Sequence, residues 1–242
     1  MQHRCHHPLA EYHRHGFIAR RGCSAAREGR AAVILDRTRH IGGLPANGLG
    51  ATDIKTRGAT GGLFKQFVKR VLQHYVSTYG PDSQQVKDSS SGYHFEASVA
   101  ESVFEQMLAE HPTITVRKER QFDAESGNVV VEDGRLTRIT ITDLSSGKRE
   151  QYRGKVFIDA TYEGDLAAAA GAPFRLGREG FDEFKEPMSG RLYKPWGGEV
   201  AEGSTGEGDD TIQAYNYRLC LTTRQDNLVP IARPDDYNRE EF

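Results

Sequence analysis

Short apolar runs and longer periodic stretches alternate along the chain. The run Ala31–Asp36 is apolar up to its last residue, an acid, and Lys155–Asp159 repeats this pattern after its first residue. Such runs are typical of strands buried on both faces of a parallel sheet. Each is followed by a glycine-containing turn. We therefore predict that the two runs are neighbouring parallel strands of one sheet.

Amphipathic helices are expected around these strands. Over Leu63–Tyr79, apolar residues recur at intervals of three and four, the period of one helix face. A glycine-proline pair beginning at Gly80 ends this stretch. After a polar loop through Ser89–Ser91, a second helix is predicted near 96–110. An alanine-rich helix follows the second predicted strand and stops at Gly171.

The region between the second helix and the second predicted strand has β character. Four segments have alternating or β-rich composition: Thr113–Arg117, Asn128–Glu132, Arg135–Asp143 and Arg149–Arg153. Asp133-Gly134 and Ser146-Gly147 stand where tight hairpin turns belong. We predict an antiparallel β-meander over about 113–153, packed beside the parallel sheet rather than continuing it.

The two ends of the chain lack this regularity. Residues 1–24 are rich in histidine and arginine without helical or strand period, which favours a disordered or non-native tail over a histidine metal site. Residues 25–172 hold the predicted α/β domain. Residues 173–242 are dominated by Gly, Pro and charge and read as an irregular, truncated segment of the substrate region. One alternating run suggests a strand there: Tyr215, Tyr217, Leu219 and Leu221.

Composition excludes several classes of protein. The chain has 242 residues, of which 37% are hydrophobic and 27% charged, which is typical of a soluble globular protein. No apolar run approaches the length of a membrane span. A net charge of −2 offers no field for a polyanion, so nucleic acid is not an expected partner. Three scattered cysteines indicate neither a disulfide framework nor zinc, and no metal site is predicted.

The chain as written also lacks the apolar stretch of a secretory signal. We therefore expect a cytoplasmic location, with export of relatives left open. The sequence indicates no oligomeric state.

Two strand ends carry candidate chemistry. Asp36 stands where a nucleotide-binding unit places the carboxylate that accepts ribose hydroxyls, although an Asp after a strand also caps ordinary turns. Thr161, Gly164 and Asp165 lie on a strand-to-helix turn whose amides could face an anion, although an ordinary helix N-terminus has the same composition. His40, His94, Tyr93 and Phe95 are weaker candidates, more typical of structural residues. The glycine-rich fingerprint expected before Asp36 is not present.

Several motifs in order resemble the FAD-dependent oxidoreductase family of the glutathione-reductase-like flavoprotein superfamily. Some relatives carry the label xanthan lyase. The resemblance covers about residue 29 to the C-terminus. It rests on the segments Val33–Asp36, Arg39–Gly43, Gly48–Asp53, Tyr93–Glu96, Val156–Leu166, Gly177–Glu179 and Gln213–Thr222.

The resemblance implies an α/β fold with a Rossmann-like FAD-binding parallel sheet and a β-meander, incomplete at its N- and C-termini. Asp36 would hold the adenosine ribose, two glycines would pass beside the dinucleotide, and the turn after Asp159 would lie by the cofactor. The flavin would carry the redox chemistry. The implied FAD-binding residues are Asp36, Arg39, Gly42, Gly43, Thr161, Gly164 and Asp165, and no catalytic residue is identified.

Three functions are compatible with these patterns. The first is an FAD-dependent oxidoreductase acting on an unknown small-molecule or carbohydrate substrate. The second is a truncated, FAD-free fragment of such an enzyme, because an apolar first strand and its glycine loop are missing and a late glycine–aspartate segment is not reached. The third is a carbohydrate-active lyase. We expect residues up to about Gly22 to lie outside the fold, and the chain as written to bind FAD weakly or not at all.

Overall fold

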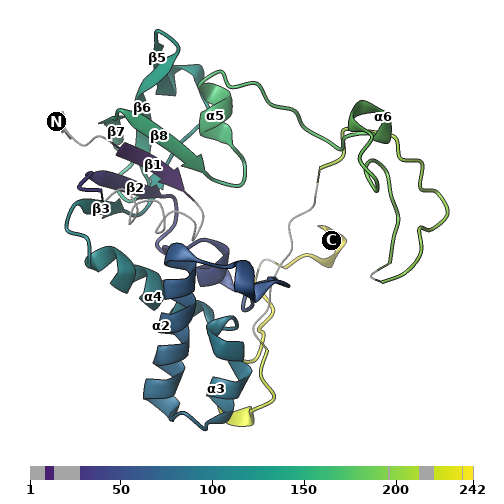
Figure 1. The fold of residues 1–242 in the computed structure, drawn as a ribbon. Helices are drawn as coiled ribbons and strands as arrows, with labels where there is room; N and C mark the ends of the chain where they lie inside the picture. The colour runs from purple at the N-terminus through teal and green to yellow at the C-terminus, as the bar shows by residue number, and fades with distance from the viewer. Residues whose placement is uncertain (1–8, 14–27, 196, 213–220, 236, 242) are drawn as a thin grey trace.

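The fold is built on a four-stranded parallel sheet. A computed structural model of the chain describes residues 9–13, 28–195, 197–212, 221–235 and 237–241. Within these, every pairing in the first sheet is parallel, and the strand order is β3-β2-β1-β8. Its strands are β1 (Leu9–His13), β2 (Ala32–Asp36), β3 (Ile114–Arg117) and β8 (Val156–Ala160) (Figure 1).

The two strands predicted from apolar runs belong to one parallel sheet, but they are not neighbours. Between them lies β1, from a segment expected to lie outside the fold. In register, Leu9 is level with Ala32 and Val156. The prediction that they are neighbours was wrong because β1 gives no sequence signal. It has only five residues, too few to show a period, and it is held on both edges by backbone hydrogen bonds, which any residue can form.

Two helices cover one face of this sheet. They are α2 (Gly62–Tyr79) and α4 (Ala97–Ala109), close to the predicted bounds, and a short α3 (Gln84–Asp88) lies within the segment expected to be a polar loop. Ile34 of β2 joins the apolar core that the helices build. Phe67 and Phe104 stack in that core with ring centroids 4.5 Å apart. In Figure 1 the helices lie below the sheet.

The antiparallel meander covers the other face, as predicted for 128–153. Its strands are β4 (Arg120–Gln121), β5 (Val129–Glu132), β6 (Arg135–Asp143) and β7 (Arg149–Arg153). Asp133 and Gly134 join β5 to β6 with positive φ values of 50° and 72°, as a tight hairpin requires. Ile139 and Ile141 pack with Leu35 of β2 in a second apolar core.

The first segment assigned to the meander belongs elsewhere. Ile114–Arg117 pairs in parallel with β2 and not with the antiparallel strands. Alternation identifies a strand but not its partner. Because α4 carries the chain back across the sheet, the strand after it runs in the same direction as β2, as in a strand–helix–strand crossover.

The chain after β8 contains little regular structure. Helix α5 (Asp165–Ala169) is the predicted alanine-rich helix, and α6 (Phe181–Phe184) follows in a segment that extends away from the sheet (Figure 1). Of the strand predicted around Tyr215, only Leu221 is described, and it is not in a strand. The 3-10 helices are η1 (Leu44–Asn47), η2 (Arg57–Ala59), η3 (Ser90–Gly92), η4 (Ser126–Asn128), η5 (Gln225–Asn227) and η6 (Arg239–Glu241).

Within the described ranges, none of the helices combines the length and the apolar character that crossing a bilayer requires.

Candidate functional site

The carboxylates at the ends of β2 and β8, Asp36 and Asp159, lie at one edge of the parallel sheet but on opposite faces. His13 of β1 is level with Asp36 and also with Ala160, so Asp159 precedes that level by one residue. Successive side chains of a strand point to opposite faces. Asp36 therefore shares the helix-side face with Ile34, whereas Asp159 faces the meander. The Asp36 and Asp159 side chains therefore do not point toward each other.

Asp36 is buried, with 2% of its surface exposed. Its Oδ1 accepts hydrogen bonds from the Thr38 amide at 2.8 Å and from the Thr38 hydroxyl at 2.9 Å. These bonds close a turn at the end of β2 and hold the carboxylate in one orientation. The turn-capping interpretation is therefore correct for Oδ1, and the ribose role stays a prediction.

The loop after β2 is fastened by an acid that the sequence did not single out. Glu101 of α4 accepts the Ile41 amide at 3.1 Å through Oε1. Its Oε2 lies 2.9 Å from His40 Nδ1. The Glu119 amide also donates to the Thr38 carbonyl, at 3.1 Å. An acid on an amphipathic helix carries no sequence signal for such a contact, because solvent-facing acids look the same.

Arg39 lies on the outside of this loop. Its side chain is 80% exposed, and Nε donates to Glu119 Oε1 at 2.8 Å. This hydrogen bond raises the pKa of the Arg39 guanidinium. Arg39 is thus placed beside the β2 end as a solvent-facing ion pair.

The two glycines after Ile41 are required by the backbone and by packing. Gly42 has φ +122°, and a Cβ placed on it would lie 2.5 Å from Phe104 Cδ2. Gly43 has φ +62° and ψ −138°, a conformation that essentially only glycine adopts. Asn47 Nδ2 donates to the Gly43 carbonyl at 2.7 Å. Close packing on α4 therefore explains the missing side chain at Gly42.

The turn after β8 is closed by its own carboxylate. Asp159 Oδ1 accepts the Thr161 amide at 3.0 Å and the Thr161 hydroxyl at 2.7 Å. Its Oδ2 accepts the first amides of α5, from Leu166 at 2.9 Å and Ala167 at 3.1 Å. The Gly164 amide donates to Thr161 Oγ1 at 2.9 Å. These four amides of the turn, which was expected to present free amides to an anionic ligand, are bound within the turn by an adjacent carboxylate and hydroxyl.

One side of this turn is open. Gly164 has φ +72°, and a Cβ placed there would meet no atom within 4 Å.

The two aromatic candidates, Tyr93 and Phe95, are buried in the helix-side core. Phe95 packs edge-on against Phe67, with centroids 5.4 Å apart, and the Tyr93 hydroxyl lies 3.0 Å from Thr60 Oγ1. Both aromatic candidates are packing residues.

A charged cluster connects three strands of the meander, β4, β6 and β7, through the side chain of Arg120. Arg120 donates two hydrogen bonds of 3.0 Å to the Glu150 carboxylate and one of 3.0 Å to Asp143. Hydrogen bonds from the Ser145 and Ser146 hydroxyls and the nearby Arg120 charge lower the pKa of Asp143 to about 2. Burial and the bond to Glu150 raise the pKa of Tyr152. Arg120 also donates to the Lys118 carbonyl at 2.9 Å, next to Glu119, whose amide binds Thr38.

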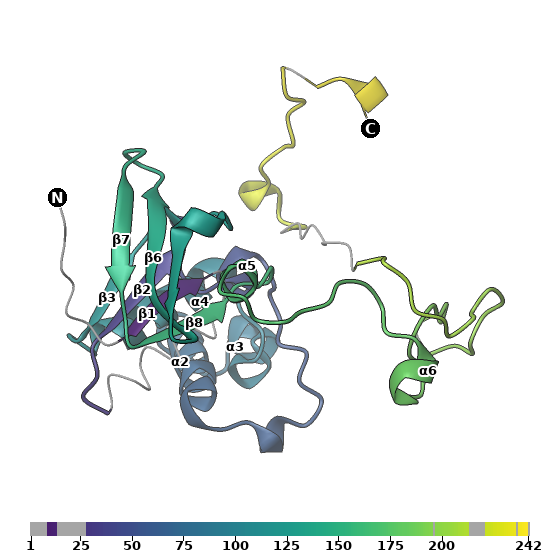
Figure 2. The ribbon, with the colours of Figure 1, turned by 90° about the horizontal axis from the view of Figure 1, so that it is seen from above.

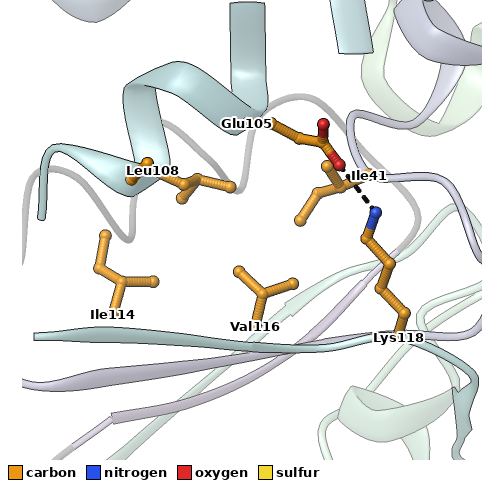
Figure 3. A pocket seen from close by; sticks show the side chains of 7 residues that line it. Ile41, Glu105, Leu108, Ile114, Val116 and Lys118 are labelled. Carbon is orange, nitrogen blue, oxygen red and sulfur yellow. Dashed lines mark hydrogen bonds and ion pairs between the residues drawn. The ribbon is translucent and has the colours of Figure 1, made fainter. Parts of the chain in front are cut away.

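A pocket of about 260 Å³ opens between α4 and β3, on the helix-side face (Figure 3). Figure 3 shows apolar side chains on its walls and the Lys118 side chain pointing toward Glu105. Lys118 Nζ lies 2.9 Å from Glu105 Oε1. No group of three or more metal-ligating side chains is found in the described part of the chain. The pocket is lined by Ile41, Glu105, Leu108, Ala109, Ile114, Val116 and Lys118.

The solved structures that resemble this chain have low sequence identity to it. The myxobacterial chondrochloren halogenase, an FAD-dependent halogenase, has 12% identity and a TM-score of 0.45, with 64% of this chain and 37% of that chain covered. The glycerol-3-phosphate dehydrogenase from Bacillus halodurans, complexed with FAD, has 6% identity, a TM-score of 0.44, and coverages of 69% and 37%.

The p-nitrophenol 4-monooxygenase from Pseudomonas putida has 10% identity, a TM-score of 0.45, and coverages of 72% and 45%. The chain thus spans less than half the length of these three proteins. No curated protein matches the chain.

The match to a protein family covers more of the chain than the matches to solved structures do. One family, described as FAD dependent oxidoreductase, matches residues 16–242. This range contains β2, both strand-end turns and the whole meander. The chain therefore belongs to the FAD dependent oxidoreductase family, whose cofactor is FAD.

Proposed function

We propose that this chain supplies the adenosine-binding part of an FAD-dependent oxidoreductase of the glutathione-reductase-like superfamily, with Asp36 accepting hydrogen bonds from the ribose. The supporting observation is the position of Asp36: a buried carboxylate at the carboxyl end of β2, level with the end of β1. Ligands of open α/β sheets bind outside the carboxyl ends of the strands. A carboxylate accepts hydrogen bonds and donates none, which suits a diol.

The residues fit the adenosine end of FAD better than its phosphates. Asp36 is held in one orientation by Thr38, so it needs little rearrangement to accept a hydroxyl. The Leu166 and Ala167 amides are bound to Asp159 and do not form an anion site. Gly16 and Gly22, which precede β2 in the sequence, lie outside the described residues.

Thr161, Gly164 and Asp165 are proposed as a second contact region. The open side of Gly164 leaves room for a ligand to approach the turn backbone closely. Gly42, Gly43 and Arg39 contribute by shaping the loop after β2. When bound, FAD supplies the redox chemistry, and the protein binds and orients it.

The substrate we propose is a small molecule or a carbohydrate. We assign no residue of this chain to its conversion. The position of both turns at the carboxyl ends of parallel strands supports the oxidoreductase over a lyase, because open α/β sheets bind ligands such as dinucleotides at this edge. We propose no catalytic base.

FAD binding to the purified chain tests the proposal. Flavin fluorescence titrations would compare the wild type with Asp36→Asn and Asp159→Asn. Both carboxylates form the same turn with a threonine two residues later, but Asp159 in addition caps α5, so Asp159→Asn tests the second proposed contact region. We expect Asp36→Asn to weaken binding by about 1.5–3 kcal/mol, the range for hydrogen bonds to a charged acceptor, and Asp159→Asn to have a smaller effect.

Equal affinity of the wild type and Asp36→Asn would remove Asp36 from the site. A wild-type chain that binds no FAD and shows no flavin absorbance would favour the FAD-free fragment instead. Far-ultraviolet circular dichroism of each variant verifies that the sheet is intact.

A further inference from the structure

The outer face of the meander carries two arginines directly opposite each other. Arg138 of β6 is the register partner of Arg153 of β7. The neighbouring residues Ile139 and Tyr152 are buried in the core against the parallel sheet. Because side chains alternate, Arg138 and Arg153 lie on the face turned away from that core. β6 and β7 run side by side in Figure 2.

This arrangement is unfavourable unless something neutralises it. Side chains directly opposite in an antiparallel pair have Cβ atoms about 4.5–5.5 Å apart, and like charges there are destabilising. Among the residues that the structure describes, neither arginine forms an ion pair with a carboxylate. Arg138 Nε is in addition buried without a hydrogen-bond partner. A buried donor without an acceptor is costly.

The immediate neighbours of the pair are uncharged. The next rung on the same face joins Thr140 to Gln151, whose side chains can donate hydrogen bonds. Val130 of β5 lies on the other side of Arg138. Two acids lie farther along this face: Glu132, two residues after Val130 on β5, and Asp123, which accepts from Gln121 and Thr142.

We propose that Arg138 and Arg153 form a binding site for the phosphate or sulfate group of a small ligand. Guanidinium groups bind such oxyanions with two parallel hydrogen bonds, and two facing guanidinium groups offer enough donors for several oxygens. The ligand would neutralise both charges and supply an acceptor near Arg138 Nε. This site is separated from Asp36 by the parallel sheet, so it is independent of the FAD proposal.

Anion-dependent thermal stability of the full chain tests this site. Inorganic phosphate and sulfate would each be titrated at ionic strength held constant with sodium chloride. We expect both anions to raise the Tm of the wild type. The anion that gives the larger shift in Tm is the group that the site prefers. Arg153→Gln should weaken anion binding about tenfold, since it removes a charged hydrogen-bond donor.

In the absence of phosphate and sulfate, Arg153→Gln should stabilise the protein. Arg153→Gln removes the repulsion across the rung, so its Tm in chloride alone should be higher than that of the wild type. Lys148→Gln is the matched control, because it removes one positive charge in the turn of the same hairpin. It should leave the anion response unchanged. Arg153→Lys, which keeps the charge without the planar fork, should bind anions with intermediate strength.

The proposal is overturned if neither anion shifts Tm beyond the chloride baseline, or if Lys148→Gln reduces the response as much as Arg153→Gln does. FAD titrations of Arg153→Gln would match those of the wild type, which separates failure here from failure of the FAD site.

Discussion

The ends of β2 and β8 carry the same turn in different surroundings. Asp36 and Asp159 each accept the amide and the hydroxyl of a threonine two residues later. After β8, the second oxygen of the same carboxylate also binds the first amides of α5. After β2, the loop is instead held by Glu101, 60 positions away from Ile41 in the sequence. Identical local turns can therefore depend on short-range contacts in one place and on tertiary contacts in another.

The largest expected effect distinguishes the glycines of the two loops. Gly42→Ala places a Cβ against Phe104 at a positive φ, and we expect it to lower the free energy of unfolding by about 3 kcal/mol. Gly164→Ala adds a Cβ in open space, so only the backbone strain of about 1 kcal/mol remains. Urea denaturation measures both. Equal losses would contradict the different packing of the two loops.

Removing the carboxylate that closes the β8 turn should be the next largest effect. Asp159→Ala leaves two amides of α5 and the Thr161 amide without their acceptor. We expect a loss of about 2 kcal/mol, as for an N-cap with an additional charged hydrogen bond. The loss is measured by denaturant unfolding, and hydrogen exchange should increase at the Leu166 amide. Unchanged exchange there would show that the turn does not depend on Asp159.

The corresponding change for the β2 loop acts from a distance. Glu101→Ala removes the acceptor of the Ile41 amide and the partner of His40. We expect a loss of about 1 kcal/mol and faster hydrogen exchange at Ile41. Glu101→Gln keeps one acceptor oxygen and should preserve most of the protection. If Glu101→Ala left the Ile41 exchange rate unchanged, the loop would be held by local contacts, as the β8 turn is.

A third turn of this kind allows a test by pH. Asp143 accepts the amide and hydroxyl of Ser145, and its pKa is lowered to about 2. A carboxyl whose folded pKa lies below its unfolded value stabilises the fold above the unfolded pKa and loses this contribution as pH falls. We expect Tm to fall between about pH 4 and pH 2, and to fall less in Asp143→Asn. Parallel pH profiles for both proteins would contradict this.

The smallest effect is expected at Arg39. Its ion pair with Glu119 is exposed, so Arg39→Gln should leave the free energy of unfolding nearly unchanged in denaturant unfolding. Because stability is nearly unaffected, a loss of FAD affinity in this variant would assign Arg39 to the cofactor. Unchanged affinity and stability would leave it as a surface ion pair of the β2 loop.

Much of the fold could be predicted from the sequence where the pattern was long. The apolar period over Leu63–Tyr79 predicted α2 almost to the residue, and Asp133-Gly134 predicted the β5–β6 hairpin. The turn cap at Asp36 was one of the two predicted roles of that residue, whereas the closure of the β8 turn by Asp159 was not predicted. The role of Glu101 was not predicted either, because its partner Ile41 is distant in sequence and no local pattern links them.

The sequence by itself determined the long helices, most strands and their turns, because a helix period, a strand period and turn residues act within a few positions. The short elements β1, β4 and α3 carried no such signal. Tertiary structure alone decided which strands are neighbours. It placed β1 between β2 and β8, paired β3 with β2, and turned Asp36 and Asp159 to opposite faces. Strand pairing uses backbone groups that every residue shares, so its partners are selected by how whole layers pack and not by local sequence.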